Sequence, residues 1–354
     1  MLNRLIKTML TGILAIGAAA AWAQAEFKIV TASERGTYII IGRDIAKIVA
    51  PAANITLEAL PSAGSAENVK RLRYEPGVKF ALVQSDVFQA FLDQAAGGNR
   101  EAGDMIRPLR VIMPLYNEEI YFIARADSPL NFVHEIRDSK INAGAIGSGT
   151  ALTTATLYRQ MFNAPMPDGN ASFLGNEDAL VKLVGDKSID VVVVVAGQPA
   201  KLLVDMKPEA RGLIKLLKAD MNHPATKAAL KTYFAATVRS ASYPNLITED
   251  TPGLAVKAFL VTYDYNVANT KTYLSAFGRA LCQNFGRLQA EGHPKWQEVK
   301  LEMPEVGKGW SYYPPIAREL RACIAGTSAV TGSKGGYRPP KVCPQVEKIL
   351  GLCE

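Results

Sequence analysis

A strand, a glycine turn and a helix follow one another over residues 141–162, and this unit constrains the fold more than any other segment. Residues 141–146 are small or β-branched, which predicts a strand, and Gly147-Ser148-Gly149 predicts a tight turn. Thr150 is a favourable N-cap for the helix. Free N–H groups and the helix dipole favour an anion at the turn, although an ordinary capped turn has the same pattern. Three hydroxyls there could bind a ligand: those of Ser148, Thr150 and Thr153.

The same succession of strand, turn and helix occurs three times in the first part of the chain. Strands are expected at 27–31, 55–59 and 80–83, and helices at 39–50, from Ser65 onward, and at 87–95. Helical crossovers between short apolar strands predict a parallel sheet. The three intervening turns then lie at the carboxyl ends of the strands, where open α/β sheets bind ligands.

The rest of the chain contains a second α/β unit and a return to the first. Two strands, 110–115 and 120–125, are expected around a turn at 116–119, in which Glu118 and Glu119 form a solvated pair. The valine run 190–195 is typical of a strand that is buried on both faces. Further expected elements are extended segments at 238–243 and 254–262, helices at 267–291 and 315–324, and a linker at 326–340 rich in Gly, Ser, Thr and Pro.

The N-terminus has the pattern of a cleaved signal peptide. Arg4 and Lys7 precede an apolar stretch, residues 9–21, that is short for a membrane span. Two small-x-small sites follow, so the mature chain is expected to begin at Gln24 or Glu26. Export to the periplasm is therefore predicted, with an uncleaved anchor as the alternative.

The four cysteines lie in the last quarter of an exported chain, which indicates disulfides, and three pairings are possible. Cys282 falls in the long predicted helix and Cys323 in the next one, while Cys343 and Cys353 flank a short helix. We predict the pairs Cys282–Cys323 and Cys343–Cys353. No Cys-x-x-Cys motif occurs and the three histidines are scattered, so neither a metal nor a cofactor is expected.

Composition and motifs argue against several functions. The net charge of +7 is modest, and no dense basic stripe interleaved with aromatics predicts nucleic-acid binding. Position 146 is Ile where a nucleophile elbow requires Gly, and neither a Walker A motif nor Gly-x-Gly-x-x-Gly after the first strand occurs. The chain is therefore not expected to be an enzyme. Its hydroxyls, amides and N–H-rich turns, without the signature of an apolar pocket, favour binding of a small carboxylate.

Several motifs, in order and at similar spacing over residues 27–324, resemble those of the TAXI-type solute receptors of tripartite ATP-independent periplasmic (TRAP) transporters. These motifs are Gly36-Thr37-Tyr38, Gly64-Ser65-Ala66-Glu67-Asn68, Val83-Gln84-Ser85-Asp86, Leu115-Tyr116, Gly147-Ser148-Gly149-Thr150, residues 190–199 and Tyr243-Pro244. The first turn departs from the family pattern because it reads Ser33-Glu34-Arg35. Arg35 is either an extra partner for a carboxylate or a surface residue.

The resemblance implies an α/β fold, the type II periplasmic binding protein, with a ligand cleft between two lobes. Residues 1–25 would be the signal peptide, 26–125 and 239–325 lobe 1, 126–238 lobe 2, and 326–354 a C-terminal extension. The expected ligand is glutamate, glutamine or a dicarboxylate like 2-oxoglutarate, delivered by a monomer to the permease subunits of a TRAP transporter. A sensor that serves a signalling partner and, less favoured, an exported enzyme are the alternatives.

The resemblance and the turns together give the candidate ligand-binding residues. Several have a structural alternative: Gln84 and Ser85 as helix caps, Tyr116 as a cleft wall, Gly197 as a backbone turn, and Tyr243 as hinge packing. The full set is Gly36, Thr37, Tyr38, Gly64, Ser65, Asn68, Gln84, Ser85, Tyr116, Ser148, Gly149, Thr150, Thr153, Gly197 and Tyr243.

Overall fold

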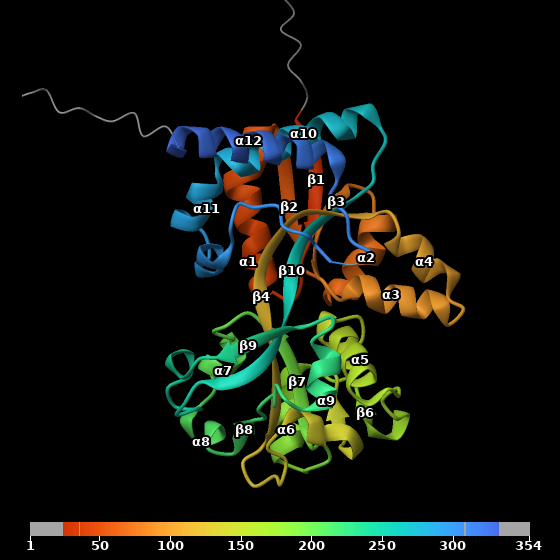
Figure 1. Cartoon of the computed structure of the whole chain (residues 1–354), viewed down its shortest axis with the longest axis vertical. Helices are drawn as coiled ribbons and strands as arrows, with labels where there is room; N and C mark the ends of the chain where they lie inside the picture. The colour runs from red at the N-terminus through yellow and green to blue at the C-terminus, as the bar shows by residue number, and fades with distance from the viewer. Residues whose placement is uncertain (1–23, 35, 308, 333–354) are drawn as a thin grey trace, which may run out of the picture.

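Two long strands connect the two lobes of the molecule. The computed structural model describes residues 24–34, 36–307 and 309–332, so Arg35, Cys343 and Cys353, and nearly all of the predicted signal peptide, lie outside the described residues. Strands β4 (Leu109–Arg125) and β10 (Thr251–Tyr263) run side by side from one lobe into the other (Figure 1). The predicted α/β architecture of two lobes with a cleft between them is confirmed.

One sheet continues through both lobes in the order β2-β1-β3-β10-β4-β7-β5-β6, with β8 on β4 and β9 on β10. Strands β1, β2 and β3 are parallel, as are β5, β6 and β7, whereas β4 and β10 are antiparallel to their neighbours. The parallel arrangement predicted from the first three strands is confirmed, although the sheet as a whole is mixed. The remaining strands are β1 (Ala25–Val30), β2 (Ile55–Leu60), β3 (Val78–Gln84), β5 (Ile141–Asn142), β6 (Ala171–Ser172), β7 (Val191–Ala196), β8 (Ile214–Leu216) and β9 (Phe234–Val238).

Lobe 1 is a sheet with helices on both faces. Helix α1 (Thr37–Asp44) continues as a π-helix (Ile45–Val49) and a 3₁₀ turn (Ala50–Ala53), and it buries Ile41, Ile45 and Ile48. It shares its core with α10 (Ala268–Gln283), α11 (Phe285–Glu291), a 3₁₀ segment (Pro294–Glu298) and α12 (Pro314–Gly332). Helices α2 (Ser65–Tyr74), α3 (Val87–Ala96) and α4 (Arg100–Ile106) cover the opposite face.

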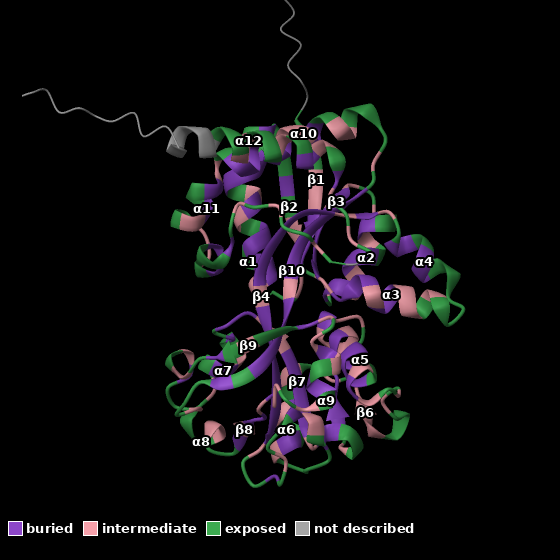
Figure 2. Cartoon of the chain, in the orientation of Figure 1, coloured by how far each residue is buried: buried purple, intermediate pink, exposed green. Residues whose placement is uncertain are grey.

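Lobe 2 is organised around β7, which is buried on both faces as the valine run predicts. Val191 and Val193 join the core under α5 (Gly149–Phe162) and α9 (Pro224–Ala229), and Val192 and Val194 join the opposite core under α6 (Asn176–Val184) and α7 (Lys201–Val204). Figure 2 shows the central strands as buried. The short elements are α8 (Pro208–Arg211) and 3₁₀ turns at Val133–Asp138, Asp168–Asn170 and Ser240–Ser242.

The expected turn at residues 116–119 does not exist, because β4 passes through it without interruption. Asn117, Glu118 and Glu119 pair with β10 opposite Lys257, Val256 and Ala255. The side chains of Glu118 and Glu119 are only 5% and 7% exposed, so their interpretation as a solvated pair is also wrong. Strand pairing across the lobes satisfies the backbone there, which polar side chains alone do not reveal.

Three other expectations are corrected by local hydrogen bonding. Ser148, not Thr150, is the N-cap of α5, since its Oγ accepts from the N–H of Ala151 at 3.0 Å. The long helix expected at 267–291 is divided at Asn284 into α10 and α11. Helix α12 continues to Gly332, so the linker expected from residue 326 begins as helix.

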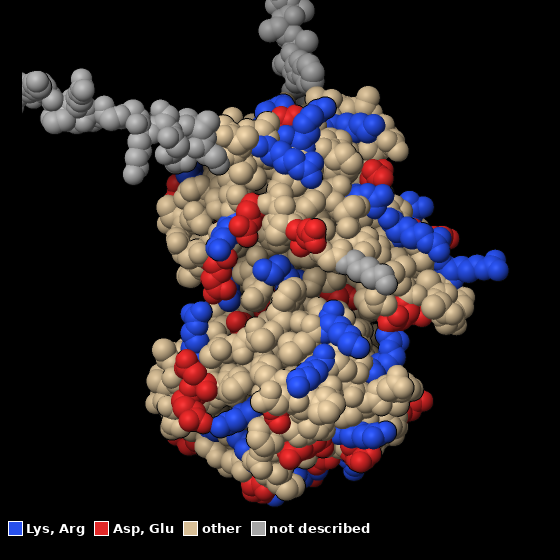
Figure 3. Space-filling model, viewed as in Figure 1, with Lys and Arg blue, Asp and Glu red and all other residues tan. Residues whose placement is uncertain are grey.

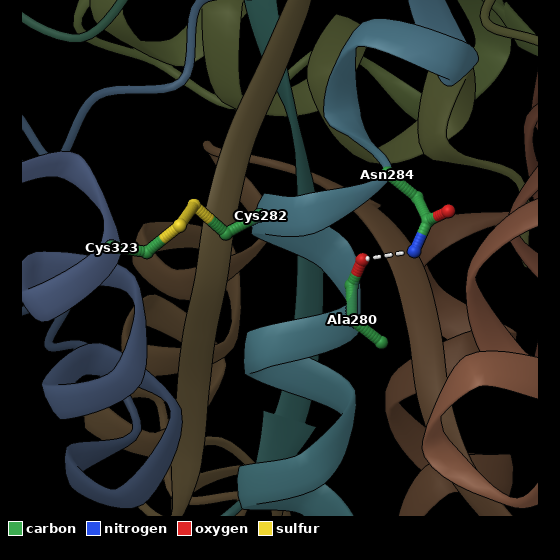
Figure 4. The surroundings of a disulfide bond; sticks show 4 residues. All are labelled: Ala280, Cys282, Asn284 and Cys323. Atoms are coloured by element: carbon green, nitrogen blue, oxygen red, sulfur yellow. Dashed lines mark hydrogen bonds between the residues drawn. A yellow bond between two sulfur atoms is a disulfide. The ribbon is translucent and has the colours of Figure 1, made fainter. Parts of the chain in front are cut away.

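A disulfide ties α10 to α12. Cys282 and Cys323 are bonded with their Cα atoms 6.4 Å apart (Figure 4), which confirms the first predicted pair. Both residues belong to or pack against the core of lobe 1. Because the bond closes a loop between cysteines 41 positions apart, it restricts the unfolded chain considerably.

We predict that the double variant Cys282→Ala/Cys323→Ala loses roughly 3–4 kcal/mol of unfolding free energy through the larger entropy of its unfolded chain. Chemical denaturation of the oxidised proteins measures the difference. The matched control is Cys343→Ala/Cys353→Ala, which leaves this loop closed and should cost less. Peptide mapping under non-reducing conditions that joined Cys323 to Cys343 would contradict the assignment.

Candidate functional site

A cleft of about 1470 Å³ lies between the lobes. In the space-filling view it falls at the narrow waist of the molecule (Figure 3). Its lobe 1 wall is built from the turns before α1 and α2 together with the ends of β3 and the middle of β4. Its lobe 2 wall is built from the turns before α5 and α6, the end of β7, and the segment from α7 to β8. The cleft therefore gathers residues from many parts of the chain.

Four helix N-termini open onto this cleft. Helices α1, α2 and α6 have glycine N-caps, namely Gly36, Gly64 and Gly175, and no side chain caps them. Helix α5 contributes its first turn, with Ser148 as its cap. Exposed N–H groups and the positive ends of helix dipoles make such termini favourable neighbours for negative charge. The polar end of the cleft is consequently suited to an anionic group.

The two lobes touch at one corner of the cleft. An added Cβ on Gly149 would lie 2.0 Å from Gln84 Oε1 and 2.8 Å from Ser65 Oγ, so lobe 1 packs directly on the first residue of α5. Gly64 has a φ of +129°, and a Cβ there would lie 3.0 Å from the backbone nitrogen of Gly149. Only glycine suits this conformation and this distance. The structure thus represents an arrangement in which the lobes are closed at this corner.

Asp86 bridges the lobes beside that corner. Its Oδ2 accepts from Thr153 Oγ1 at 2.6 Å and from the hydroxyl of Tyr233 at 2.9 Å, and both donors belong to lobe 2. The side chain of Asp86 is 1% exposed, and its Oδ1 has no hydrogen-bond partner among the described residues. Burial raises the pKa of Asp86 to about 6, against the opposing effect of the two hydroxyl donors. Closing of the lobes is therefore linked to protonation.

Glu118 is the acidic group on the floor of the cleft. It projects from β4, and its Oε2 accepts a 2.6 Å hydrogen bond from the hydroxyl of Tyr38. Burial raises the pKa of Glu118 to about 7, although hydrogen bonds from Tyr38 and Gln84 lower it. Near neutral pH this carboxyl is divided between a neutral form that donates a hydrogen bond and an anionic form that repels another anion.

Nine of the fifteen candidate residues line the cleft. In lobe 1, the Tyr38 hydroxyl donates a hydrogen bond to Glu118. The Oγ of Ser65 accepts a hydrogen bond from the Gln84 N–H at 3.0 Å and donates a weak one to Gln84 Oε1 at 3.4 Å. In lobe 2, Thr150 Oγ1 accepts from the N–H of Val195 at 3.3 Å. The nine are Gly36, Thr37, Tyr38, Gly64, Ser65, Gln84, Ser148, Gly149 and Thr150.

Three candidates lie behind the cleft wall and hold its turns. Asn68 donates to the backbone oxygens of Thr31 and Leu82, which fastens α2 to the ends of β1 and β3. Ser85 exchanges hydrogen bonds with the backbone of Lys257 on β10. Thr153 contacts Asp86 as described and is fully buried. The structure gives each of them protein partners and places none on the cleft surface.

The other three candidates lie around the junction of the lobes. The Tyr116 ring is 1% exposed and lies under the ammonium of Lys295, which is 5.5 Å from the ring centroid. A Cβ on Gly197 would be 2.8 Å from Lys295 Cε, so lobe 1 also approaches lobe 2 here. The Tyr243 hydroxyl bonds the hydroxyl of Tyr121 at 2.8 Å and accepts from the N–H of Ala200 at 2.6 Å.

Two features of the site differ from the expectations. Glu118 lies on a strand and not in a turn, and the apolar and aromatic residues on both sides of it, with no Gly or Pro at 116–119, are the signal of a continuous strand. The cleft also has an extended apolar part, formed by α6 and by the segment from α7 to β8, where no apolar pocket is expected. Leu180, Leu202 and Leu213 line this part. Their convergence depends on tertiary packing, which no local pattern encodes.

Comparison with known proteins gives one family and a set of related folds. The NMT1-like family matches residues 29–302. The periplasmic binding protein BugD is 13% identical, with 87% of this chain and 97% of that chain covered and a TM-score of 0.48. The sulfonate-binding protein SsuA of Methylobacillus flagellatus KT is 11% identical over 87% of each chain, with a TM-score of 0.43. SsuA of Escherichia coli is 14% identical, over 84% and 83%, with a TM-score of 0.39.

No helix in the part of the chain that the structure describes is both long and apolar enough to cross a membrane. No group of three or more His, Cys, Asp and Glu residues within it has the geometry to hold a metal ion.

We predict that Gly149→Val opens the cleft, because the new side chain would collide with Gln84 and Ser65 in the closed arrangement. Overpacking of this kind costs about 1–3 kcal/mol, enough to depopulate the closed form several-fold or more. Small-angle X-ray scattering of the ligand-free protein should show a larger radius of gyration. Gly169→Val is the matched control, since a Cβ at Gly169 meets nothing within 4 Å. Equal radii for the two variants would contradict the contact.

We predict that closure is favoured at acidic pH. The pKa of Asp86 is raised to about 6 when the lobes enclose it and returns to an ordinary value near 3.8 when they open. At a pH between these two pKa values, closing of the lobes therefore takes up a proton. The closed form is then fully stabilised below pH 4 and loses stability as pH rises to 6. The radius of gyration should therefore increase from pH 4 to pH 7, and Asp86→Asn should remove that dependence. A pH-dependent radius in the variant would assign the effect to another group.

Proposed function

The chain belongs to the NMT1-like family, and we propose that it is a solute-binding protein that closes its two lobes over a small anionic solute. The observation that carries the proposal is the cleft, into which the N-termini of α1, α2, α5 and α6 open from both lobes. A ligand held by donors from both lobes stabilises the closed arrangement over the open one. The proposal contains no catalytic step.

We also propose that the protein delivers this solute to a membrane transporter. The motifs shared with TAXI-type receptors support a carboxylate as the solute and the permease of a TRAP transporter as the partner. The signal-like N-terminus supports export to the periplasm, with residues 1–25 removed. The boundaries that the resemblance implies are residues 26–125 and 239–325 for lobe 1 and residues 126–238 for lobe 2. The pairing of residues 119–125 with β7 and β8 and of residues 251–255 with β9 supports crossings that lie inside β4 and β10 instead.

Glu118 favours a second candidate, a cationic solute. Among the described residues, which do not include Arg35, no arginine lines the cleft, and Glu118 is the charged lining residue that is buried. Glu34, by contrast, pairs with Arg43 at 2.7 Å, and Lys201 pairs with Asp205 at the rim. An ionised Glu118 would attract an amine, whereas a protonated Glu118 would donate a hydrogen bond to a carboxylate. The two candidates therefore differ in the protonation state that binding requires.

A thermal-shift screen tests the function. Glutamate, glutamine, 2-oxoglutarate and succinate represent the anionic candidates, simple alkylamines the cationic ones, and neutral sugars the negative control. A ligand at a hundredfold excess over Kd stabilises the folded protein by ~2.7 kcal/mol. We expect one acid or a close relative to raise the melting temperature. A response to sugars alone would contradict the proposal.

We predict opposite pH profiles for the two kinds of solute. A carboxylate requires Glu118 to be protonated, so its affinity should fall as pH rises through about 7, by up to roughly tenfold per pH unit above that value. Glu118→Gln keeps a neutral hydrogen-bonding side chain and should bind the carboxylate with little dependence on pH. Calorimetric titration of both proteins with an acid and with an alkylamine from pH 6 to 8.5 measures both profiles. Amine binding that is lost in Glu118→Gln and that tightens in the parent at high pH would instead establish the cationic solute.

A further inference from the structure

We infer that the solute is amphipathic: its charged head lies at the helix N-termini, and an extended apolar group lies in a groove of lobe 2 between α6 and the segment from α7 to β8. This inference deepens the proposed function and rests on it for the position of the head. It adds an apolar group to the compact acid that the thermal-shift screen tests.

The cleft is larger than a compact acid requires, because its volume is about 1470 Å³. Typical ligand sites of about 300–1,000 Å³ already enclose drug-sized molecules. A dicarboxylate of four to six carbons would fill only the polar end and leave the remainder to water. The groove belongs to the same cavity as the helix N-termini, so one molecule can occupy both.

The walls of the groove are aliphatic. Helix α6 contributes Leu180, Val181 and Val184, and the segment from α7 to β8 contributes Leu202, Met206 and Leu213. Val194 of β7 and Ile214 of β8 also line the cavity. These residues provide no hydrogen-bonding side chain, so they do not bind a second polar group.

Two large apolar residues of the groove are exposed to water. Val181 is 71% exposed and Leu213 is 50% exposed, and both line the cavity. Exposed apolar residues gathered around one cavity are typical of a surface that an apolar group covers. Across the cleft, Ile40 of α1 is 39% exposed and also lines the cavity. Closure of lobe 1 therefore brings a further apolar contact toward this region.

The ionisable residues along the groove are exposed: Glu177 of α6, the ion pair of Lys201 with Asp205, and Lys207 before α8. Lys201 and Asp205 compensate each other, and the opposite charges of Glu177 and Lys207 leave the groove without a net charge. The anionic or cationic preference of the cleft is thus set at the other end, by Glu118 and the helix N-termini, while the groove selects for apolar length.

The experiment is calorimetric titration with straight-chain monocarboxylates of four, six, eight and ten carbons below their micelle concentrations, at pH 6.5. Burial of each methylene is worth up to about fourfold in affinity. We expect one-to-one binding that tightens with chain length until the groove is filled. The variants Val181→Asp, on α6, and Leu213→Asp, just before β8, should flatten this dependence while binding of the four-carbon acid changes little.

Val204→Asp is the matched control, because Val204 is 44% exposed on α7 but does not line the cavity. It should keep the dependence on chain length. Equal affinities for four and ten carbons in the parent protein would overturn the inference and leave the proposed function intact. Absence of binding by any acid at any length would contradict the anionic function itself. Equal loss in all three Asp variants would also overturn the inference, since it would indicate a general surface effect.

Discussion

The antiparallel pairing of β4 with β10 is the interaction on which the rest of the structure depends. The two strands belong to both lobes: β10 pairs with β3 in lobe 1 and with β9 in lobe 2, and β4 continues to β7 and β8. Motion between the lobes must therefore bend this pair. The register of the β4–β10 pair shifts between Lys257, which pairs with Asn117, and Phe259, which pairs with Pro114. Such an irregularity locally disrupts the hydrogen bonds between two strands. The hinge and the cleft floor consequently share the same residues.

Contacts across the cleft show how closing is coupled to charge. Asp86 must leave water to meet Thr153 and Tyr233, and Glu118 is buried beside Tyr38. In both cases burial disfavours the anion more than the hydrogen bonds favour it, so the pKa values rise. The closed arrangement thus has two carboxyl groups whose protonation responds to lobe position or to a nearby ligand. Their roles differ, because Asp86 lies between the lobes and Glu118 faces the cavity.

The cleft combines two kinds of surface that serve different purposes. At one end, helix N-termini offer directional N–H donors, which select charge and orientation. At the other end, aliphatic side chains of α6 and of the α7–β8 segment offer only contact area, which selects size. A ligand that reaches both ends gains specificity from the first and affinity from the second.

The sequence by itself determined the local elements and the chemistry of the polar turns. The valine run of β7, the apolar face of α1 and the glycine turns before α2 and α5 were predictable, since each depends on neighbours within a few residues. The same holds for nine candidate residues that line the cleft and for the Cys282–Cys323 pair, whose helices were recognisable. Only the tertiary structure decided that Tyr116 to Glu119 continue a strand, because β10, more than a hundred residues later, provides the hydrogen bonds. It likewise placed Asn68, Ser85 and Thr153 behind the wall and brought Leu180 and Leu213 together, since burial and contact between distant segments leave no local pattern in the chain.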